Sequence, residues 1–170
     1  MFDAATIQAL FKALDEELSR IGVVGEVGIC GGAVMCLVFE ARKSTKDVDA
    51  VFQPAAKIRQ ASRRVARRMG VDEGWLNDAA KGFFYSDPPK QAVLDLPHLR
   101  VWAPTADYML AMKCLAARFD THDKEDVELL IERLWLTTPE QVFELVAKYC
   151  PKSLVPAKTQ FFVEELFSGS

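Results

Sequence analysis

The sequence predicts an α+β fold in which a small mixed sheet, flanked by helices, is followed by a purely helical region. Apolar residues first recur at helical spacing and then form short strand-like runs at residues 23–30 and 47–52. After Pro104 every apolar pattern is helical. A chain of 170 residues can bury one core and carry a helical annex. We therefore expect a core at residues 1–103 and a helical region at residues 104–170 packed on it.

The N-terminal helix is expected to begin after Asp3, whose carboxylate suits an N-cap, and to end at Gly22. Residues 23–30 then form the first strand, and residues 33–40, which are apolar almost all round, form a buried helix. The buried face of the first helix is defined by Ile7, Leu10, Phe11, Leu14, Leu18 and Ile21.

A polar loop leads to the second strand at residues 47–52, after which Pro54 opens a third helix. Residues 71–97 show little periodicity, and an irregular segment of this length in a compact domain is usually functional. Short strands are expected at residues 92–96 and 99–102. The remaining helices are expected at residues 105–119, around residues 127–134, after the capping box that starts at Thr138, and at residues 159–167.

The composition is that of an ordinary soluble protein, with 50% hydrophobic and 26% charged residues. No apolar run approaches the roughly 20 residues that a membrane span needs. The N-terminus also lacks the basic and apolar regions of a signal peptide. We expect a cytoplasmic protein with no membrane partner.

The four cysteines are scattered and form no Cys-x-x-Cys pair, and neither histidine stands at zinc-ligand spacing from a cysteine. Buried free thiols are the better interpretation, and a zinc site is not expected. These cysteines are Cys30, Cys36, Cys114 and Cys150.

The third helix carries six basic residues and no acid between residues 57 and 68, although the chain has a net charge of −3. This run is either a solvated outer face or an electrostatic platform for RNA, such as tRNA, or another polyanion. The six residues are Lys57, Arg59, Arg63, Arg64, Arg67 and Arg68.

Two adjacent glycines, Gly31 and Gly32, follow the first strand, and Asp47 and Asp49 open the second. Alternate residues of a strand share a face, so the two carboxylates should project together while Val48 turns to the core. Paired carboxylates suit Mg²⁺, and glycines let backbone N–H groups approach phosphates at a helix N-terminus. The pattern predicts a metal–nucleotide site.

Residues 29–52 resemble the signature of the nucleotidyltransferase superfamily with the polymerase-β-like fold, in which two small residues precede an Asp-x-Asp strand. The residue pattern formed by Arg42, Ser44, Asp47 and Asp49 is more similar still to the AbiEii-like branch. That branch includes minimal nucleotidyltransferases and toxins of toxin–antitoxin systems. Lys113, followed by Asp123 and Asp126, resembles a second element of the same branch.

The resemblance implies an NTP substrate, Mg²⁺ with Mn²⁺ as a substitute, and a protein partner if the chain is a toxin. Gly31 and Gly32 would cradle the phosphates, and Asp47 and Asp49 would hold the metal. The other implied roles are nucleotide binding by Arg42, Ser44 and Lys113, and a base or orienting group at Asp126.

Several of these residues have a structural alternative. Lys113 can extend to solvent from an amphipathic helix, Asp126 can stabilise a helix dipole from its first turn, and Arg42 can pair with a neighbouring acid. The superfamily also places a third carboxylate on a later strand. Asp95 is the best-placed candidate for it, with Asp78 in reserve.

Two functions of different class follow. The first is a Mg²⁺-dependent enzyme that moves a nucleoside monophosphate from an NTP to a hydroxyl of RNA, a protein or a small molecule. The second is a catalytically degenerate nucleotide-binding or regulatory module that acts through protein contacts. A generic α/β domain with a coincidental Asp-x-Asp is the remaining alternative.

Overall fold

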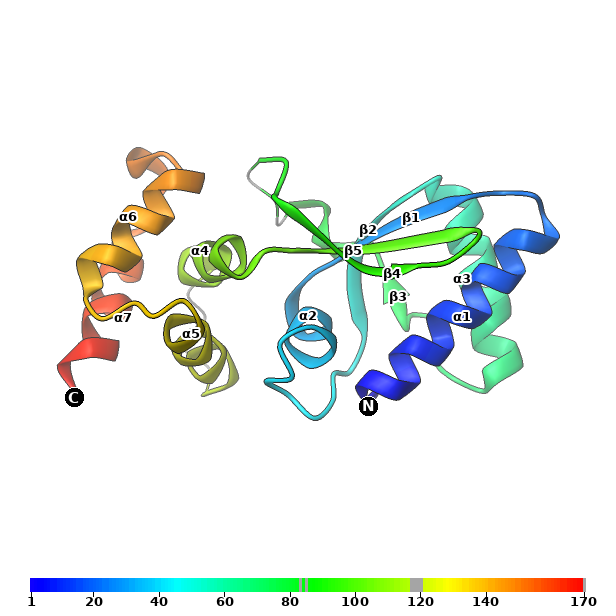
Figure 1. The fold of residues 1–170 in the computed structure, drawn as a ribbon, viewed down its shortest axis with the longest axis horizontal. Coiled ribbons are helices and arrows are strands. Elements are labelled where there is room, and N and C mark those ends of the chain that lie inside the picture. The colour runs from blue at the N-terminus through cyan, green and yellow to red at the C-terminus, as the bar shows by residue number, and fades with distance from the viewer. Residues whose placement is uncertain (83, 85, 117–120, 170) are drawn as a thin grey trace. The chain divides into compact units, whose positions relative to one another are not determined.

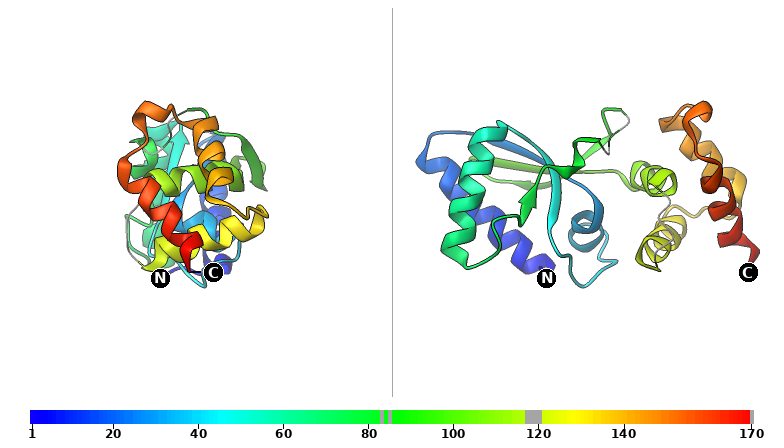
Figure 2. Two further views of the ribbon diagram at one scale, coloured as in Figure 1. Left: turned by 90° about the vertical axis from the view of Figure 1, so that its left-hand side faces the viewer. Right: turned by 180° about the vertical axis from the view of Figure 1, so that it is seen from behind.

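The computed structural model describes residues 1–82, 84, 86–116 and 121–169, which divide into two compact units (Figures 1 and 2). The first unit holds residues 1–82 and 90–104, and the second holds the other described residues. The segment before Lys90 belongs to the helical unit because Pro89 O accepts from Thr105 N at 3.1 Å and Ser86 O accepts from the Tyr108 hydroxyl at 3.2 Å. The boundary after Pro104 lies one residue beyond the predicted one.

The first unit is built around a mixed five-stranded sheet in the order β3-β2-β1-β5-β4. β1 runs antiparallel to β2 and parallel to β5, β2 is parallel to β3, and β4 is antiparallel to β5. Its elements are α1 (Ala4–Arg20), β1 (Gly25–Ile29), α2 (Gly31–Leu37), β2 (Val48–Gln53), α3 (Ala55–Met69), β3 (Leu76–Asn77), the 3₁₀ turn η1 (Ala79–Gly82), β4 (Lys90–Asp95) and β5 (Leu99–Pro104). The mixed sheet with flanking helices confirms the α+β class.

One face of the sheet is apolar and packs on α1 and α3, which lie side by side (Figure 1). A Cβ on Gly25 would meet Leu18 of α1 at 2.9 Å and Ile58 of α3 at 3.0 Å, so this face of β1 meets both helices. The fully buried side chains on this face come from three neighbouring strands: Val27, Ile29, Val48, Ala50, Leu99, Val101 and Ala103. Burying each large aliphatic side chain of this kind stabilises the fold by about 1.5–3 kcal/mol.

The opposite face of the sheet is more polar. By register, Gly28 pairs with Val51 and with Trp102, and alternation along β2 adds Asp49 to the same face. None of these four residues shares the face that meets α1 and α3. This second face therefore carries the chemistry-bearing side chains of the unit.

The first helix forms as expected, with the Asp3 carboxylate accepting from Thr6 N at 2.8 Å. Ile21, assigned to the buried face, is instead 37% exposed because it is the C-cap beside Gly22, whose φ is +63°. Trp75 lies in the segment without periodicity and is nevertheless core. Its indole packs edge-on against Phe11 at 5.9 Å and donates to Ser62 O at 3.1 Å.

The second unit is helical, and its central helix is buried along nearly its whole length. Thr138 forms the predicted capping box with Gln141. The last helix begins two residues before the predicted start, and residues 117–119 of the expected 105–119 helix lie outside the described residues. The elements are α4 (Ala106–Ala116), α5 (Thr121–Arg133), α6 (Pro139–Tyr149), η2 (Lys152–Leu154) and α7 (Ala157–Ser168).

All four cysteines are buried, as expected for thiols that pack as small apolar groups. Among the described residues, no helix combines the length and apolar character that crossing a bilayer requires.

Candidate functional site

The glycine turn sits at the end of β1, directly against the second strand. Cys30 N donates to Asp49 O at 2.9 Å, and the chain then turns through Gly31 with φ +60°. A Cβ on Gly31 would lie 3.5 Å from the Asp49 carboxylate. The buried helix starts on Gly31 itself, two residues earlier than predicted, so the two glycines form its first turn. Gly31 and Asp49 are therefore neighbours, as the sequence predicts.

Val48 is fully buried between Asp47 and Asp49, and β2 begins at Val48, one residue later than predicted, so that Asp47 directly precedes the strand. Burial and, next, the charge of Asp49 raise the pKa of the Asp47 carboxyl, while Lys46 opposes the rise. Two carboxylates that disfavour each other's charge form an arrangement that a divalent cation relieves. The pair fits a cation site.

Thr45 completes the turn, although the sequence interpretation selected its neighbour Ser44. Thr45 is 7% exposed, and its hydroxyl donates to Asp47 O at 3.1 Å. A Cβ on Gly32 would come within 2.7 Å of the same hydroxyl oxygen. A signal for Thr45 is available in the sequence, because this residue precedes Asp47 by two positions.

Arg42 also reaches the turn. One guanidinium nitrogen lies 3.5 Å from the position of a Cβ on Gly32. Ser44 is partly exposed in the same loop. Asn77 is a further polar residue that sequence reasoning missed, since β3 pairs it in register with Asp49. Its carboxamide oxygen accepts from Ala79 N at 3.0 Å.

Asp95 lies away from the pair, contrary to the placement we predicted for a third carboxylate. Asp95 is the last residue of β4 and pairs with Arg100 of β5. Across the sheet, Arg100 pairs with Glu26 of β1, and Glu26 pairs with Gln53 of β2. Gln53 is the last residue of β2, whereas Asp49 lies near its start. The register separates Asp95 from Asp49 by about 13 Å along the strands and about 14 Å across them. Its side chain is 81% exposed and faces Arg100 at 3.7 Å.

Asp78 lies on the other face of the sheet, because it follows Asn77 and alternation turns it toward α3. There it accepts from Arg59 at 2.6 Å and pairs with Lys81 at 2.9 Å. Hydrogen bonds from Lys81 and Arg59 lower the pKa of this carboxyl. Within the described residues no group of three His, Cys, Asp or Glu side chains could hold a metal. The site has two carboxylates.

Lys113 and Asp126 come together in the second unit, where α4 packs on α5. Lys113 Nζ lies 2.7 Å from Asp126 and 3.0 Å from Asp123, and the lysine and Asp126 are only 7% and 2% exposed. Lys113 therefore does not extend to solvent. Burial raises the pKa of the adjacent Cys114 thiol to about 12, against the opposing effect of Lys113.

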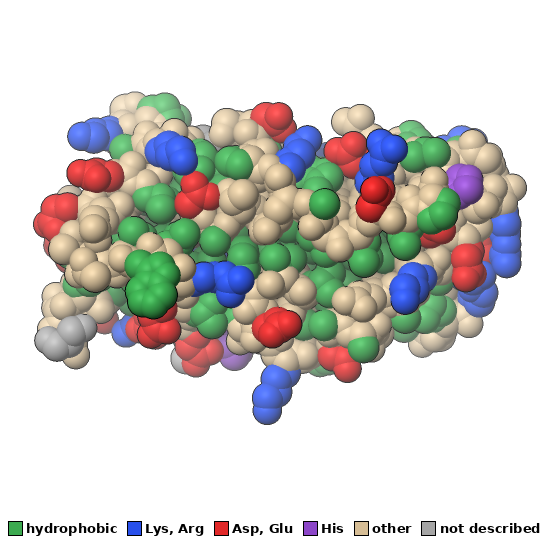
Figure 3. Space-filling model, viewed as in Figure 1, with side chains coloured by type: hydrophobic (Ala, Val, Ile, Leu, Met, Phe, Trp, Pro, Cys, Tyr) green, Lys and Arg blue, Asp and Glu red, His purple; other side chains and the backbone are tan. Residues whose placement is uncertain are grey.

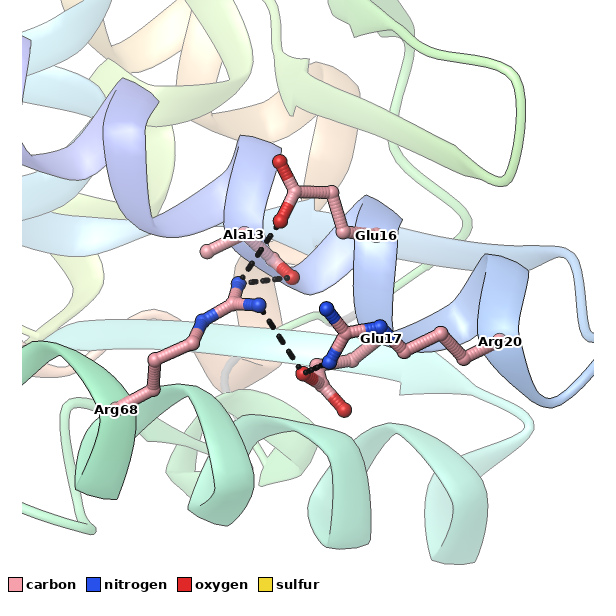
Figure 4. Close-up of polar contacts among 5 residues, drawn as sticks. All are labelled: Ala13, Glu16, Glu17, Arg20 and Arg68. Carbon is pink, nitrogen blue, oxygen red and sulfur yellow. Dashed lines mark hydrogen bonds and ion pairs between the residues drawn. The ribbon is translucent and has the colours of Figure 1, made fainter.

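The basic run of α3 is largely paired with acids from other segments. Arg68 contacts Glu16 at 3.1 Å, Glu17 at 3.3 Å and Ala13 O at 3.2 Å, and Arg20 joins the cluster through Glu17 (Figure 4). Elsewhere in the run, Arg59 pairs with Asp78, and Arg63 and Arg67 pair with Glu73. On the face drawn in Figure 3, Lys and Arg side chains are likewise spread among acids.

Two hollows lie apart from these residues. One of about 350 Å³ is lined by Val24, Glu26 and Arg100, at the end of the sheet opposite to Asp49. The other, of about 390 Å³, lies in the second unit between Phe143 and Gln160. Neither is lined by a predicted site residue.

The arrangement can offer two carboxylate oxygens, a hydroxyl, a guanidinium and a glycine turn to one ligand. No protein-family model matches the chain, and comparison with curated proteins and with solved structures found no significant match.

Proposed function

We propose that this protein is a Mg²⁺-dependent nucleotidyltransferase that moves a nucleoside monophosphate from an NTP to a hydroxyl acceptor. The observation that carries the proposal is the convergence of the Gly31-Gly32 turn, Thr45 and the Asp47/Asp49 pair at one end of the sheet. Each of these groups suits a metal-bound triphosphate, and they come from two separate segments of the chain, residues 31–32 and 45–49.

The donor set fits Mg²⁺, which proteins usually hold through one or two carboxylates together with substrate phosphates and water. Asp47 and Asp49 would hold the ion, and Mn²⁺ would substitute for it. The bound ion would neutralise phosphate charge. Gly31 and Gly32 would cradle the phosphates, as the resemblance implies, and the Thr45 hydroxyl, which donates to Asp47 O, fixes the turn beside them. Arg42 would contribute positive charge at the same turn.

In the reaction, the acceptor oxygen would form a bond to the α-phosphorus as the bond to pyrophosphate breaks, and the hydroxyl proton would pass to a base. The resemblance implies that Asp126 is such a base or an orienting group, and that Lys113 contacts a phosphate or the developing charge. Their ion pair at 2.7 Å holds both side chains in a fixed orientation. Phosphoryl transfer depends mainly on such positioning and charge stabilisation.

Transfer of label tests the proposal. The protein is incubated with each α-³²P-labelled NTP, Mg²⁺ and cell extract, beside an Asp47→Asn/Asp49→Asn variant and an Asp95→Asn control. We expect labelled acceptor with the unchanged protein and the control, and none with the double variant. Label that persists in the double variant would contradict the assigned site.

A degenerate nucleotide-binding module is the second candidate, favoured by the absence of a third carboxylate in the described cluster. Such a module would stabilise on binding Mg²⁺–NTP without transferring label, and would act through a protein partner. A thermal shift with no transfer to any acceptor supports the module. No thermal shift and no transfer would exclude both functions.

RNA, including tRNA, is one acceptor class to test. Lys57 and Arg64 are the basic residues of α3 that form no ion pair with any described residue, so they would carry most of the phosphate contact. Lys57→Glu/Arg64→Glu should weaken RNA binding and reduce its salt dependence. An unchanged salt slope would point to a protein or small-molecule acceptor.

A further inference from the structure

The second unit carries a largely apolar hollow of about 390 Å³ between α6 and α7, two helices that pack on each other (Figure 1). Its walls include Phe143 and Val146 of α6 and Ala157 of α7, and its polar lining consists of Lys152 and Gln160. Val146 is buried, so the hollow reaches down to the packed contact between the two helices. The space is ample for one phenyl ring.

A large exposed aromatic side chain stands beside this hollow. Phe161 is 68% exposed, and it follows Gln160 and lies one helical turn beyond Ala157, both of which line the hollow. Leu154, which is 53% exposed, precedes the lining residue Val155. Exposed apolar residues grouped around a recess are typical of a protein–protein contact. We call the hollow together with Leu154 and Phe161 the α6–α7 face.

The α6–α7 face also carries a charge of each sign. Lys152 lines the hollow, and Glu165 lies one helical turn beyond Phe161. Both side chains are exposed, and neither forms a hydrogen bond or an ion pair with another residue that the structure describes. The base therefore belongs to the recess and the acid to the projecting helix surface.

We propose that the α6–α7 face is the interface of a symmetric dimer, in which Phe161 of each copy inserts into the hollow of the other. A two-fold interface joins the same surface of two copies, so that surface must hold both members of every complementary pair. The α6–α7 face does so twice, since it has a projection with a recess and an acid with a base. A different partner protein would require only one member of each pair. The dimer does not depend on the proposed transferase activity.

Sedimentation equilibrium of the full chain over a wide range of protein concentrations tests the interface. We expect the unchanged protein to approach twice the mass of one chain. Phe161→Ser removes the projection, and Ala157→Trp fills the recess from an exposed position of α7. Losing a central aromatic contact costs about 30-fold in affinity, and a dimer loses it twice, so each variant should dimerise roughly 1000-fold more weakly. Trp135→Ser, at the 88% exposed tryptophan of the same unit, should dimerise as the unchanged protein does.

An equimolar mixture of the two variants gives the sharper result. Phe161 of the Ala157→Trp copy still fits the open hollow of the Phe161→Ser copy, so a mixed dimer recovers one of the two contacts. It should be about 30-fold weaker than the unchanged dimer and about 30-fold stronger than a dimer of either variant alone. Non-specific apolar association would give no such recovery.

Charge reversal tests the second pair. Lys152→Glu and Glu165→Lys should each weaken the dimer, and the double variant should restore it, because the base and the acid then exchange places. Three results would overturn the interface: a monomer at every concentration, a dimer that neither Phe161→Ser nor Ala157→Trp weakens, or a mixture that associates no better than its components.

Discussion

Gly32 is the residue at which the candidate site is most sensitive to a single methyl group. In the first turn of a helix, Gly→Ala would ordinarily stabilise by about 0.5–1 kcal/mol. Here the new Cβ meets the Thr45 hydroxyl at 2.7 Å, and Thr45 is held by backbone hydrogen bonds to Phe2 at 2.6 and 2.9 Å. We expect Gly32→Ala to lower the free energy of unfolding by about 1–3 kcal/mol, measured by urea denaturation.

The matched background is Thr45→Ala, which removes the clashing oxygen. There the same glycine substitution should be neutral or stabilising, so that the two changes are strongly coupled. An equal cost of Gly32→Ala in both backgrounds would show that the close approach of Thr45 is not its cause.

Asp47 should make the metal-free protein less stable as the pH rises. Burial and the charge of Asp49 raise its pKa in the folded state above the ordinary 3.8, so the folded state binds this proton more tightly than the unfolded chain does. The contribution of Asp47 to the free energy of unfolding is therefore fully present below pH 3.8 and is lost as the pH rises through the folded-state pKa of this carboxyl. In EDTA at pH 7, Asp47→Asn should raise the Tm, and this gain should vanish at low pH.

Added Mg²⁺ should reverse that ranking, because a cation that binds the native carboxylate pair stabilises only the protein that retains it. Asp95→Asn is the control, since this 81% exposed side chain stands far from the pair. A Tm gain from Asp47→Asn that is the same at all pH values would contradict the electrostatic cause.

At the scale of elements, the buried ion pair between Lys113 and Asp126 connects α4 to α5. In the sequence, only the family resemblance suggested that these two residues belong together. Removing one member of a buried ion pair leaves the other charge buried, at a cost of about 3–5 kcal/mol. We expect Lys113→Met to cost that much in urea denaturation, and Asp126→Asn to cost less, because Asp123 still pairs with Lys113 at 3.0 Å. The double variant Lys113→Met/Asp126→Leu should cost much less than the two together.

These three variants also distinguish a structural role of Lys113 and Asp126 from a catalytic one. If the pair has only a structural role, the double variant regains stability and keeps label transfer. If Lys113 and Asp126 also act on the nucleotide and acceptor, stability returns while transfer stays lost. If the single variants were as stable as the unchanged protein, the Lys113–Asp126 ion pair would make no measurable contribution to the stability of the α4–α5 packing.

The third helix, α3, shows that local sequence patterns predict the boundaries of a helix but not the ion-pair partners of its side chains. Its boundaries follow from Pro54, from the spacing of Ile58 and Val65, and from Gly70, which ends it with φ +68°. Its charges look one-sided only because the acids that pair with them come from α1 and from residues just after the helix. Helical periodicity places a side chain on a face, but the partner across the tertiary contact comes from the packing of α3 on α1.

At the scale of the whole chain, local signals located the glycine turn and the Asp-x-Asp strand, and the structure brings them together because β1 and β2 are neighbours. The position of Asp95 could not be predicted in the same way. It depends on β4 being the outermost strand, paired to β5 in a register that puts Asp95 level with Arg100. Strand order is a non-local property, and no residue near Asp95 encodes it.

The two compact units divide the proposed chemistry, since Asp47 and Asp49 belong to the first and Lys113 and Asp126 to the second. Nucleotide binding by the first set can therefore be measured by itself. We expect Mg²⁺–ATP to slow amide hydrogen exchange at residues 29–32 and 45–49 of the full chain. The Asp47→Asn/Asp49→Asn variant should show no such protection. If Mg²⁺–ATP left exchange at these residues of the unchanged protein as it was, the candidate site would not be the nucleotide site.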